Sequence, residues 1–102
     1  MRRYIRSSTY DSYISIKNDY PLVATLDDDL YGRCLSVYDQ SEDMDDGKYR
    51  YALLDDQNKD VVEIREHSYD SKWIYRYIKD LRDHRWDGRL LTINYSPNYR
   101  PF

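Results

Sequence analysis

The clearest pattern of apolar and polar positions in this chain lies between His67 and Gly88. Its apolar residues recur at intervals of three and four, which is the period of one helix face, and charged residues occupy the positions between them. Ser68 and Asp70 are favourable N-cap residues, and a glycine beyond the last turn is typical of a helix end. The pattern therefore predicts a helix over residues 70–86. Its apolar face comprises Trp73, Ile74, Tyr77, Ile78 and Leu81.

Most of the remaining chain alternates between apolar and polar residues with period two, which is typical of half-buried strands. Short polar connections separate the middle segments, so successive strands should pair as an antiparallel meander. We predict an α+β fold in which an antiparallel sheet of four to six strands carries one main helix on one face. Strands are predicted at 10–17, 22–26, 31–38, 48–54, 61–65 and 90–95, with Tyr4 and Ile5 as further candidate strand positions.

The length of 102 residues suits one domain with a single core. No internal repeat and no linker divides residues 1–102, so we predict one domain over the whole chain. Residues 96–102 contain two prolines and should form an extended tail.

Tyrosine is unusually frequent, with 13 tyrosines against one phenylalanine. A tyrosine combines a large apolar ring with a polar hydroxyl, so it suits half-buried positions and contact surfaces better than a dry core. Many of these tyrosines should serve as core or cross-strand residues, since aromatic residues favour strands. The number exceeds what one small core can use, so we expect some to be displayed.

Charge is distributed unevenly around a net value of −3. Residues 27–60 carry eleven carboxylates against four cations, whereas the segments before and after them each carry a net charge of +2. Binding to a phosphate backbone requires clustered positive charge, so the acidic middle favours a partner protein with a basic surface over direct wrapping by nucleic acid.

The sequence carries few signs of a cofactor, a metal or an export signal. Cys34 is the single cysteine and lies in an apolar strand pattern, so we expect a buried thiol and no internal disulfide. No apolar run approaches the length of a membrane span, and no signal peptide precedes the first elements, so we expect a cytoplasmic protein. An EF-hand around Gly47 fails, because Met44 and Leu53 would occupy ligand positions. We therefore expect no metal, no cofactor and no enzymatic activity. The enzymatic alternative is a catalytic pair of Cys34, or of an aspartate, with one of the two histidines. The metal alternative is a looser divalent-ion site from Asp43, Asp45 and Asp46.

Acidic residues cluster in the predicted loops and strand ends, and they form the first candidate binding set. Carboxylates held on a rigid sheet imitate a row of phosphates and so compete with nucleic acid for a basic channel. The same clustering also fits a role in solubility alone. The set comprises Asp27, Asp28, Asp29, Asp39, Glu42, Asp43, Asp45, Asp46, Asp55 and Asp56.

Aromatic and basic residues in and after the predicted helix form the second candidate set. Tyrosine, tryptophan and arginine concentrate binding energy at interfaces, and single-stranded bases stack on them. A solvated basic helix face is the alternative. The set comprises Tyr75, Arg76, Arg82, Arg85, Trp86, Arg89, Tyr95 and Tyr99, with Arg100 downstream.

The chain begins with Met1-Arg2-Arg3-Tyr4-Ile5-Arg6-Ser7-Ser8, which resembles the starts of small orphan proteins from phages and mobile elements of Gram-positive bacteria. In its acidic, tyrosine-rich composition the chain also resembles type II anti-CRISPR proteins. The resemblance implies a bacterial host cell and a partner such as Cas9 or another CRISPR effector. It implies that the acidic clusters occupy a surface that otherwise receives guide RNA or DNA.

Two functions are therefore expected. The first is a non-enzymatic inhibitor that binds a nucleic-acid-handling host complex, with a CRISPR effector as the expected partner. The second is a single-stranded nucleic-acid-binding protein that stacks bases on an exposed tyrosine and arginine surface.

Overall fold

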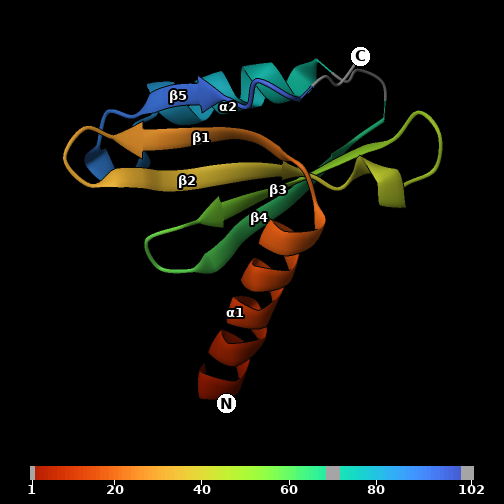
Figure 1. Cartoon of the computed structure of the whole chain (residues 1–102), viewed down its shortest axis with the longest axis horizontal. Helices are drawn as coiled ribbons and strands as arrows, with labels where there is room; N and C mark the ends of the chain where they lie inside the picture. The colour runs from red at the N-terminus through yellow and green to blue at the C-terminus, as the bar shows by residue number, and fades with distance from the viewer. Residues whose placement is uncertain (1, 69–71, 100–102) are drawn as a thin grey trace.

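The computed structural model describes residues 2–68 and 72–99, and it describes the side chains of the first helix from Tyr10 onward. Over these residues the chain forms two α-helices, two short 3₁₀ helices and five strands (Figure 1). Their order is α1 (Arg2–Asp19), β1 (Leu22–Asp28), β2 (Gly32–Asp39), η1 (Ser41–Asp43), β3 (Tyr49–Asp55), β4 (Asp60–His67), α2 (Trp73–Asp83), η2 (Trp86–Gly88) and β5 (Thr92–Tyr95).

The strands form one antiparallel sheet in the order β4-β3-β2-β1-β5. Strands β1 to β4 follow one another as a meander, and β5 returns to pair with the free side of β1. The predicted α+β class, with an antiparallel sheet of four to six strands, is confirmed. Four predicted strands of the meander and the last predicted strand each appear with shifts of a few residues at their ends.

The first element differs from the prediction. Residues 2–19 form α1, so the strand predicted at 10–17 and the candidate strand positions Tyr4 and Ile5 are wrong. The alternation at 10–17 coexists with a helical spacing, since Tyr13 and Ile16 are three residues apart and both are buried. The Tyr13 hydroxyl donates to Asp56 Oδ1 at 2.6 Å, and Lys17 Nζ lies 3.8 Å from the same oxygen. These contacts fix the second half of α1 against the turn between β3 and β4.

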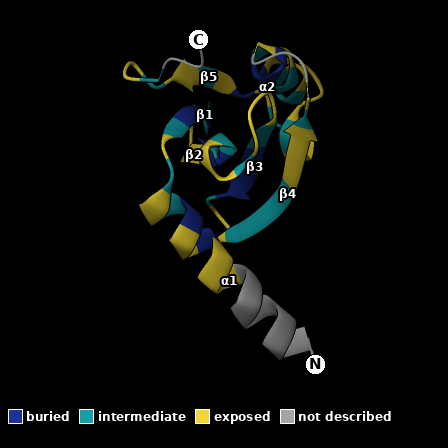
Figure 2. Ribbon diagram, turned by 90° about the vertical axis from the view of Figure 1, so that its right-hand side faces the viewer, coloured by how far each residue is buried: buried dark blue, intermediate teal, exposed yellow. Residues whose placement is uncertain are grey.

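Each face of the sheet therefore carries a helix over the described residues, whereas one main helix on one face was predicted. Figure 2 shows α1 below the sheet and α2 above it. On the α2 side, Ile74 and Ile78 pack with Leu26 and Leu53 in the larger apolar cluster. The smaller cluster on the α1 side comprises Tyr13, Ile16, Tyr38, Ala52 and Leu54.

Three register shifts interrupt the strand ladders, and each leaves one extra residue without a cross-strand partner. In the β1–β2 ladder these residues are Val23 and Cys34, and in the β3–β4 ladder the residue is Val62. All three belong to, or pack against, the α2-side cluster. Extra residues of this kind bend a strand and increase its twist.

The predicted helix at 70–86 is present but shorter, since α2 covers Trp73–Asp83 and residues 69–71 lie outside the described part. After α2 the chain turns through Arg85 and Asp87, both with positive φ, and forms η2. The described part of the predicted tail is docked, because Ser96 N donates to Val23 O at 2.9 Å and Tyr99 Oη donates to Asp39 Oδ2 at 2.7 Å.

Candidate anion-binding groove

The curvature of the sheet gives α2 a strand on each flank. Figure 2 shows the sheet bending so that its two edge strands, β5 and β4, rise on either side of α2. One hollow lies between α2 and the segment that leads into β5, and another lies between α2 and β4. The two hollows differ in charge, and this difference decides which of them suits an anionic ligand.

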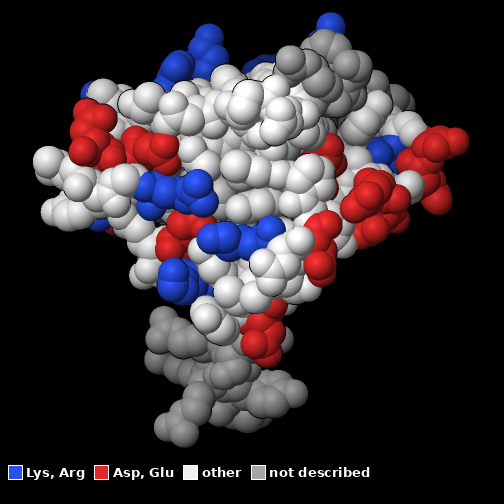
Figure 3. All heavy atoms as spheres, viewed as in Figure 1, with Lys and Arg blue, Asp and Glu red and all other residues white. Residues whose placement is uncertain are grey.

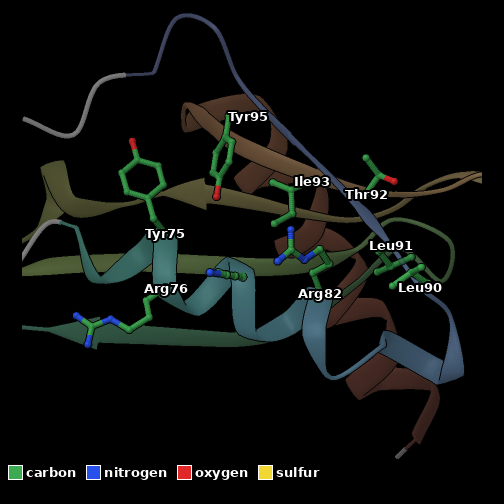
Figure 4. A pocket seen from close by; sticks show the side chains of 9 residues that line it. Tyr75, Arg76, Arg82, Leu90, Leu91, Thr92, Ile93 and Tyr95 are labelled. Atoms are coloured by element: carbon green, nitrogen blue, oxygen red, sulfur yellow. The ribbon is translucent and has the colours of Figure 1, made fainter.

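The first hollow, which we call the α2–β5 groove, has a volume of about 590 Å³. Apolar side chains of the segment into β5 form much of one wall, with Leu91 buried and Leu90 exposed. Figure 4 shows Arg82 pointing towards Ile93 and Tyr95, and Arg76 extending away from the tyrosines. The lining comprises Tyr75, Arg76, Lys79, Arg82, Leu90, Leu91, Thr92, Ile93 and Tyr95.

The cations of the groove come from one stripe of α2. Arg76, Lys79 and Arg82 succeed one another at intervals of three residues, so they share a side of the helix. No carboxylate is among the described lining residues of the groove. Just outside the lining, Asp83 pairs with Arg82, whose Nε donates to Asp83 Oδ1 at 3.1 Å. The cations of the groove still outnumber this one carboxylate, in a protein whose net charge is −3.

Two tyrosines close one end of the α2–β5 groove. The rings of Tyr75 and Tyr95 meet edge to face, with centroids 5.4 Å apart, and Figure 4 shows them side by side. Burial, with a smaller contribution from Tyr75, raises the pKa of Tyr95, and Arg82 lowers it. The Tyr95 hydroxyl is therefore protonated at neutral pH and can donate a hydrogen bond to an anion.

The second hollow, which we call the α2–β4 cavity, has a volume of about 440 Å³ and a lining of mixed charge. The Tyr77 hydroxyl donates to Glu63, and the Arg65 guanidinium lies over the Tyr77 ring, 5.3 Å from its centroid. Arg65 also lies 3.8 Å from Glu63. These charges are matched within the chain, so the cavity offers an anion less than the groove does.

The second predicted set, of aromatic and basic residues, is divided by the structure. Four of its members, Tyr75, Arg76, Arg82 and Tyr95, come together in the groove, whereas Arg85 and Trp86 line the α2–β4 cavity. Lys79 and the apolar wall were missed. The regular spacing of Arg76, Lys79 and Arg82 was a signal that could have added Lys79 to the set.

The other two described members of this set serve the fold. Arg89 Nη1 donates to Gln57 Oε1 at 2.8 Å and lies 3.4 Å from Cys34 Sγ, and its guanidinium covers the Tyr31 ring. Tyr99 reaches Asp39 and lies 3.0 Å from the Tyr51 hydroxyl. Arg100 lies outside the described residues.

The predicted acidic set lies at the two ends of the sheet, not along one edge (Figure 3). Asp27, Asp28 and Asp29 close the β1–β2 hairpin, and Asp55 and Asp56 close the β3–β4 hairpin at the same end. The opposite end carries the β2–β3 connection, which holds Glu42, Asp43, Asp45 and Asp46.

Most carboxylates at the hairpin end organise their own turns. Asp28 Oδ1 accepts from Leu30 N and Tyr31 N, and Asp55 Oδ1 accepts from Gln57 N and Asn58 N. The remaining carboxylates of this end have other contacts: Asp27 with Thr25 and Asn94, and Asp56 with Tyr13 and Lys17. Asp29 is exposed.

The β2–β3 connection is held in place while it displays its acidic residues. Gln40 N donates to Arg50 O at 2.8 Å, and Arg50 N donates to Ser41 Oγ at 3.0 Å. The Tyr20 hydroxyl donates to Asp43, which ties the connection to the end of α1. Three further carboxylates, Glu42, Asp45 and Asp46, are exposed.

Within the described part of the chain, no hydrogen bond or ring contact joins Cys34 to His67 or His84. Cys34 is fully buried, as predicted. The His67 ring stacks on Trp73, with centroids 5.2 Å apart, and His84 Nδ1 lies 2.8 Å from Asp80 O. Within residues 2–68 and 72–99, no group of three or more His, Cys, Asp and Glu side chains is placed to hold a metal ion. None of the helices in this part of the chain is long and apolar enough to cross a membrane.

Comparison with protein-family models, with curated proteins and with solved structures finds no match to this chain. The candidate site therefore has to be interpreted from its own geometry and charge.

Proposed function

We propose that the protein binds single-stranded nucleic acid in the α2–β5 groove. The observation that carries this proposal is the cationic stripe of Arg76, Lys79 and Arg82 in one groove. Arg82 of this stripe points towards Tyr95, which is 47 % exposed. Cations along a groove bind the phosphate backbone, and exposed aromatic rings stack with bases. An apolar wall beside them suits the bases and sugars of an unpaired strand.

The geometry favours a flexible single strand over a rigid duplex. The three cations lie within seven residues of one helix, and the six steps between the first and the last correspond to roughly 9 Å along its axis, so they reach only a few nucleotides. A base must leave its stack in a duplex to lie on Tyr95, whereas an unpaired base is already available. Because few phosphates are contacted and the whole chain is acidic, binding should be modest and sensitive to salt.

A titration of labelled oligouridylate and oligothymidylate at low salt, followed by fluorescence anisotropy, tests this proposal. The double substitution Lys79→Ala/Arg82→Ala should weaken binding by about tenfold and should make the salt dependence shallower, by about 0.7 in log–log slope for each lost phosphate contact. Tyr95→Ala should also weaken binding by about tenfold, through the lost stacking, and should leave the salt slope unchanged.

The double substitution Lys48→Ala/Arg33→Ala is the matched control, because it removes one lysine and one arginine outside the groove. Polyglutamate as a competitor separates base recognition from simple attraction to a polyanion. The proposal fails if neither oligonucleotide binds at low salt, or if the control weakens binding as much as the groove variants do.

A second candidate function is inhibition of a nucleic-acid-handling host complex, such as a CRISPR effector. The observation that favours it is the β2–β3 connection, which displays Glu42, Asp45 and Asp46 while backbone hydrogen bonds hold its base. Fixed carboxylates speed encounter with a basic channel and exclude the polyanion that normally occupies it.

The charge reversal Asp45→Lys/Asp46→Lys separates the two functions and leaves Asp43 to keep its contact with Tyr20. Under the inhibitor hypothesis the reversal should abolish co-purification with Cas9 and inhibition of DNA cleavage, whereas Asp11→Lys/Asp19→Lys on α1 should not. Under the nucleic-acid hypothesis the same reversal should strengthen oligonucleotide binding. Unchanged inhibition by the reversed protein would contradict the role of this connection.

A further inference from the structure

Strand β4 leaves one long side of the sheet open. It contains eight residues and pairs only with β3, whereas the other edge strand, β5, contains four. Among the described residues, Val61 to Glu66 make no backbone hydrogen bond beyond the ladder with β3. Ile64, Arg65 and Glu66 are exposed. A strand edge of this length is a template for pairing with another strand, so its side chains decide which strand is accepted.

The side chains around Ile64 are complementary in charge to those of an identical strand that runs antiparallel to them. In an antiparallel pair of identical strands centred on Ile64, Glu63 of each copy lies opposite Arg65 of the other, and the two Ile64 side chains meet. The pairing of β4 with β3 shows on which face of the sheet each side chain lies. Glu63 and Arg65 lie opposite Leu53 and Tyr51, whereas Ile64 lies opposite Ala52 on the other face. Both ion pairs would therefore form on the α2 side and the isoleucine contact on the α1 side.

Other registers are less favourable. Centring the pair on Glu63 places two carboxylates opposite each other, and centring it on Arg65 places two guanidinium groups opposite each other. The two intermediate registers place Ile64 of one copy opposite Glu63 or Arg65 of the other. Like charges directly across a strand pair are destabilising. Charges on an edge strand often block pairing altogether, but here their order selects a single register.

We propose that β4 pairs antiparallel with β4 of a second copy, with the two-fold axis at Ile64, to give one continuous sheet. Ile64 is 49 % exposed in the single chain, and pairing would cover it. In the single chain Arg65 already lies 3.8 Å from its own Glu63, so the dimer extends this pair into a ladder of alternating charges. An interface of one strand pair is small, and the dimer should therefore be weak, in the micromolar range or above.

A concentration series by analytical ultracentrifugation measures this dimer. The single reversals Glu63→Arg and Arg65→Glu each place like charges across the axis and should weaken dimerisation by at least about tenfold. The exchange Glu63→Arg/Arg65→Glu restores opposite charges at both positions and should recover dimerisation to within about threefold of the unsubstituted chain. Circular dichroism confirms that each variant is folded.

Cross-linking gives a second measurement that does not depend on the charged residues. Oxidation of Ile64→Cys should give a covalent dimer, because directly opposite residues in an antiparallel pair have Cβ atoms about 4.5–5.5 Å apart. Ile14→Cys, at an exposed apolar position of α1, is the matched control and should not cross-link; the native Cys34 is buried. A chain that stays monomeric at the highest concentration overturns the proposal, as does a dimer that ignores the reversals or that the exchange fails to restore.

Discussion

Raising the pH above 10 should unfold this protein over a narrow range. Among the tyrosines whose pKa is raised from the ordinary value of 10.0, four have large shifts, in each case chiefly through burial. In Tyr51 burial raises the pKa to about 12. In Tyr13 and Tyr77 a hydrogen bond donated to Asp56 or Glu63 raises it further. In Tyr99 the hydrogen bonds with Tyr51 and Asp39 do the same.

Stability should decrease as the pH rises, because the folded chain keeps these phenolic protons to a higher pH than the unfolded chain does. An unfolded chain releases these phenolic protons near pH 10.0, whereas folded Tyr51 keeps its proton until about pH 12. Stability is therefore intact below pH 10 and falls as the pH rises towards the pKa values of the folded chain. Each such tyrosine removes about 1.4 kcal/mol per pH unit, so four remove roughly 5–6 kcal/mol, which is comparable with the whole stability of a small domain.

Urea unfolding at a series of pH values between about 9 and 11 measures this slope, with tyrosinate absorbance as the record of ionisation. Tyr99→Phe is the informative variant, because it removes one of the four protons with large shifts and should reduce the slope by about 1.4 kcal/mol per pH unit. Stability that stays constant across this range would contradict the prediction. So would ionisation of all the tyrosines while the fold persists.

The substitution Ile78→Ala should lower the free energy of unfolding substantially, though by less than a rise of one pH unit above pH 10 does. Ile78 lies on α2, is fully buried, and packs in the α2-side cluster against the sheet. Ile78→Ala removes buried methyl and methylene groups and leaves a cavity, so we expect a loss of about 2–5 kcal/mol in the free energy of unfolding.

Ile14→Ala is the matched control, because Ile14 lies on α1 and is 37 % exposed. We expect it to cost less than about 1 kcal/mol. Urea denaturation followed by tryptophan fluorescence, to which Trp73 contributes as a buried reporter that is 8 % exposed, measures both variants. Equal losses in the free energy of unfolding for the two substitutions would show that α2 is not the main helix covering the core.

The sequence predicted α2 and the meander because their signals are local. Ile74 and Ile78 are both buried, as their spacing indicated, and polar turns separate β2, β3 and β4 where breaker residues cluster. The ends of α2 were less predictable. The expected continuation to residue 86 stops at Asp83, since the chain adopts positive φ at Arg85.

Helix α1 was missed because its sequence satisfies two periods at once. Tyr10, Ile14 and Ile16 alternate with polar residues as in a strand, whereas Tyr13 and Ile16 are the residues that α1 buries. Their burial depends on Ala52 and Leu54, which are distant in the sequence. A local pattern could not decide between the two, because the deciding contacts are tertiary.

The groove could be predicted only in part, for a similar reason. The positions of Arg76 and Arg82 follow from the helix. Tyr95 joins them because β5 pairs with β1, and this strand pairing cannot be predicted from the local sequence. Arg89 and Tyr99 have the composition of contact residues and instead hold the fold together. A residue type that suits interfaces also suits half-buried positions inside a small domain.

The extra residues Val23, Cys34 and Val62 lengthen their strands without changing which residues face each other across the ladders. A shorter chain with the same cross-strand partners would form a flatter sheet. A flatter sheet would leave α2 resting on a plane, without walls on its two sides. The three surplus positions thus contribute to the concave architecture on which both hollows depend, although none of them lines either hollow.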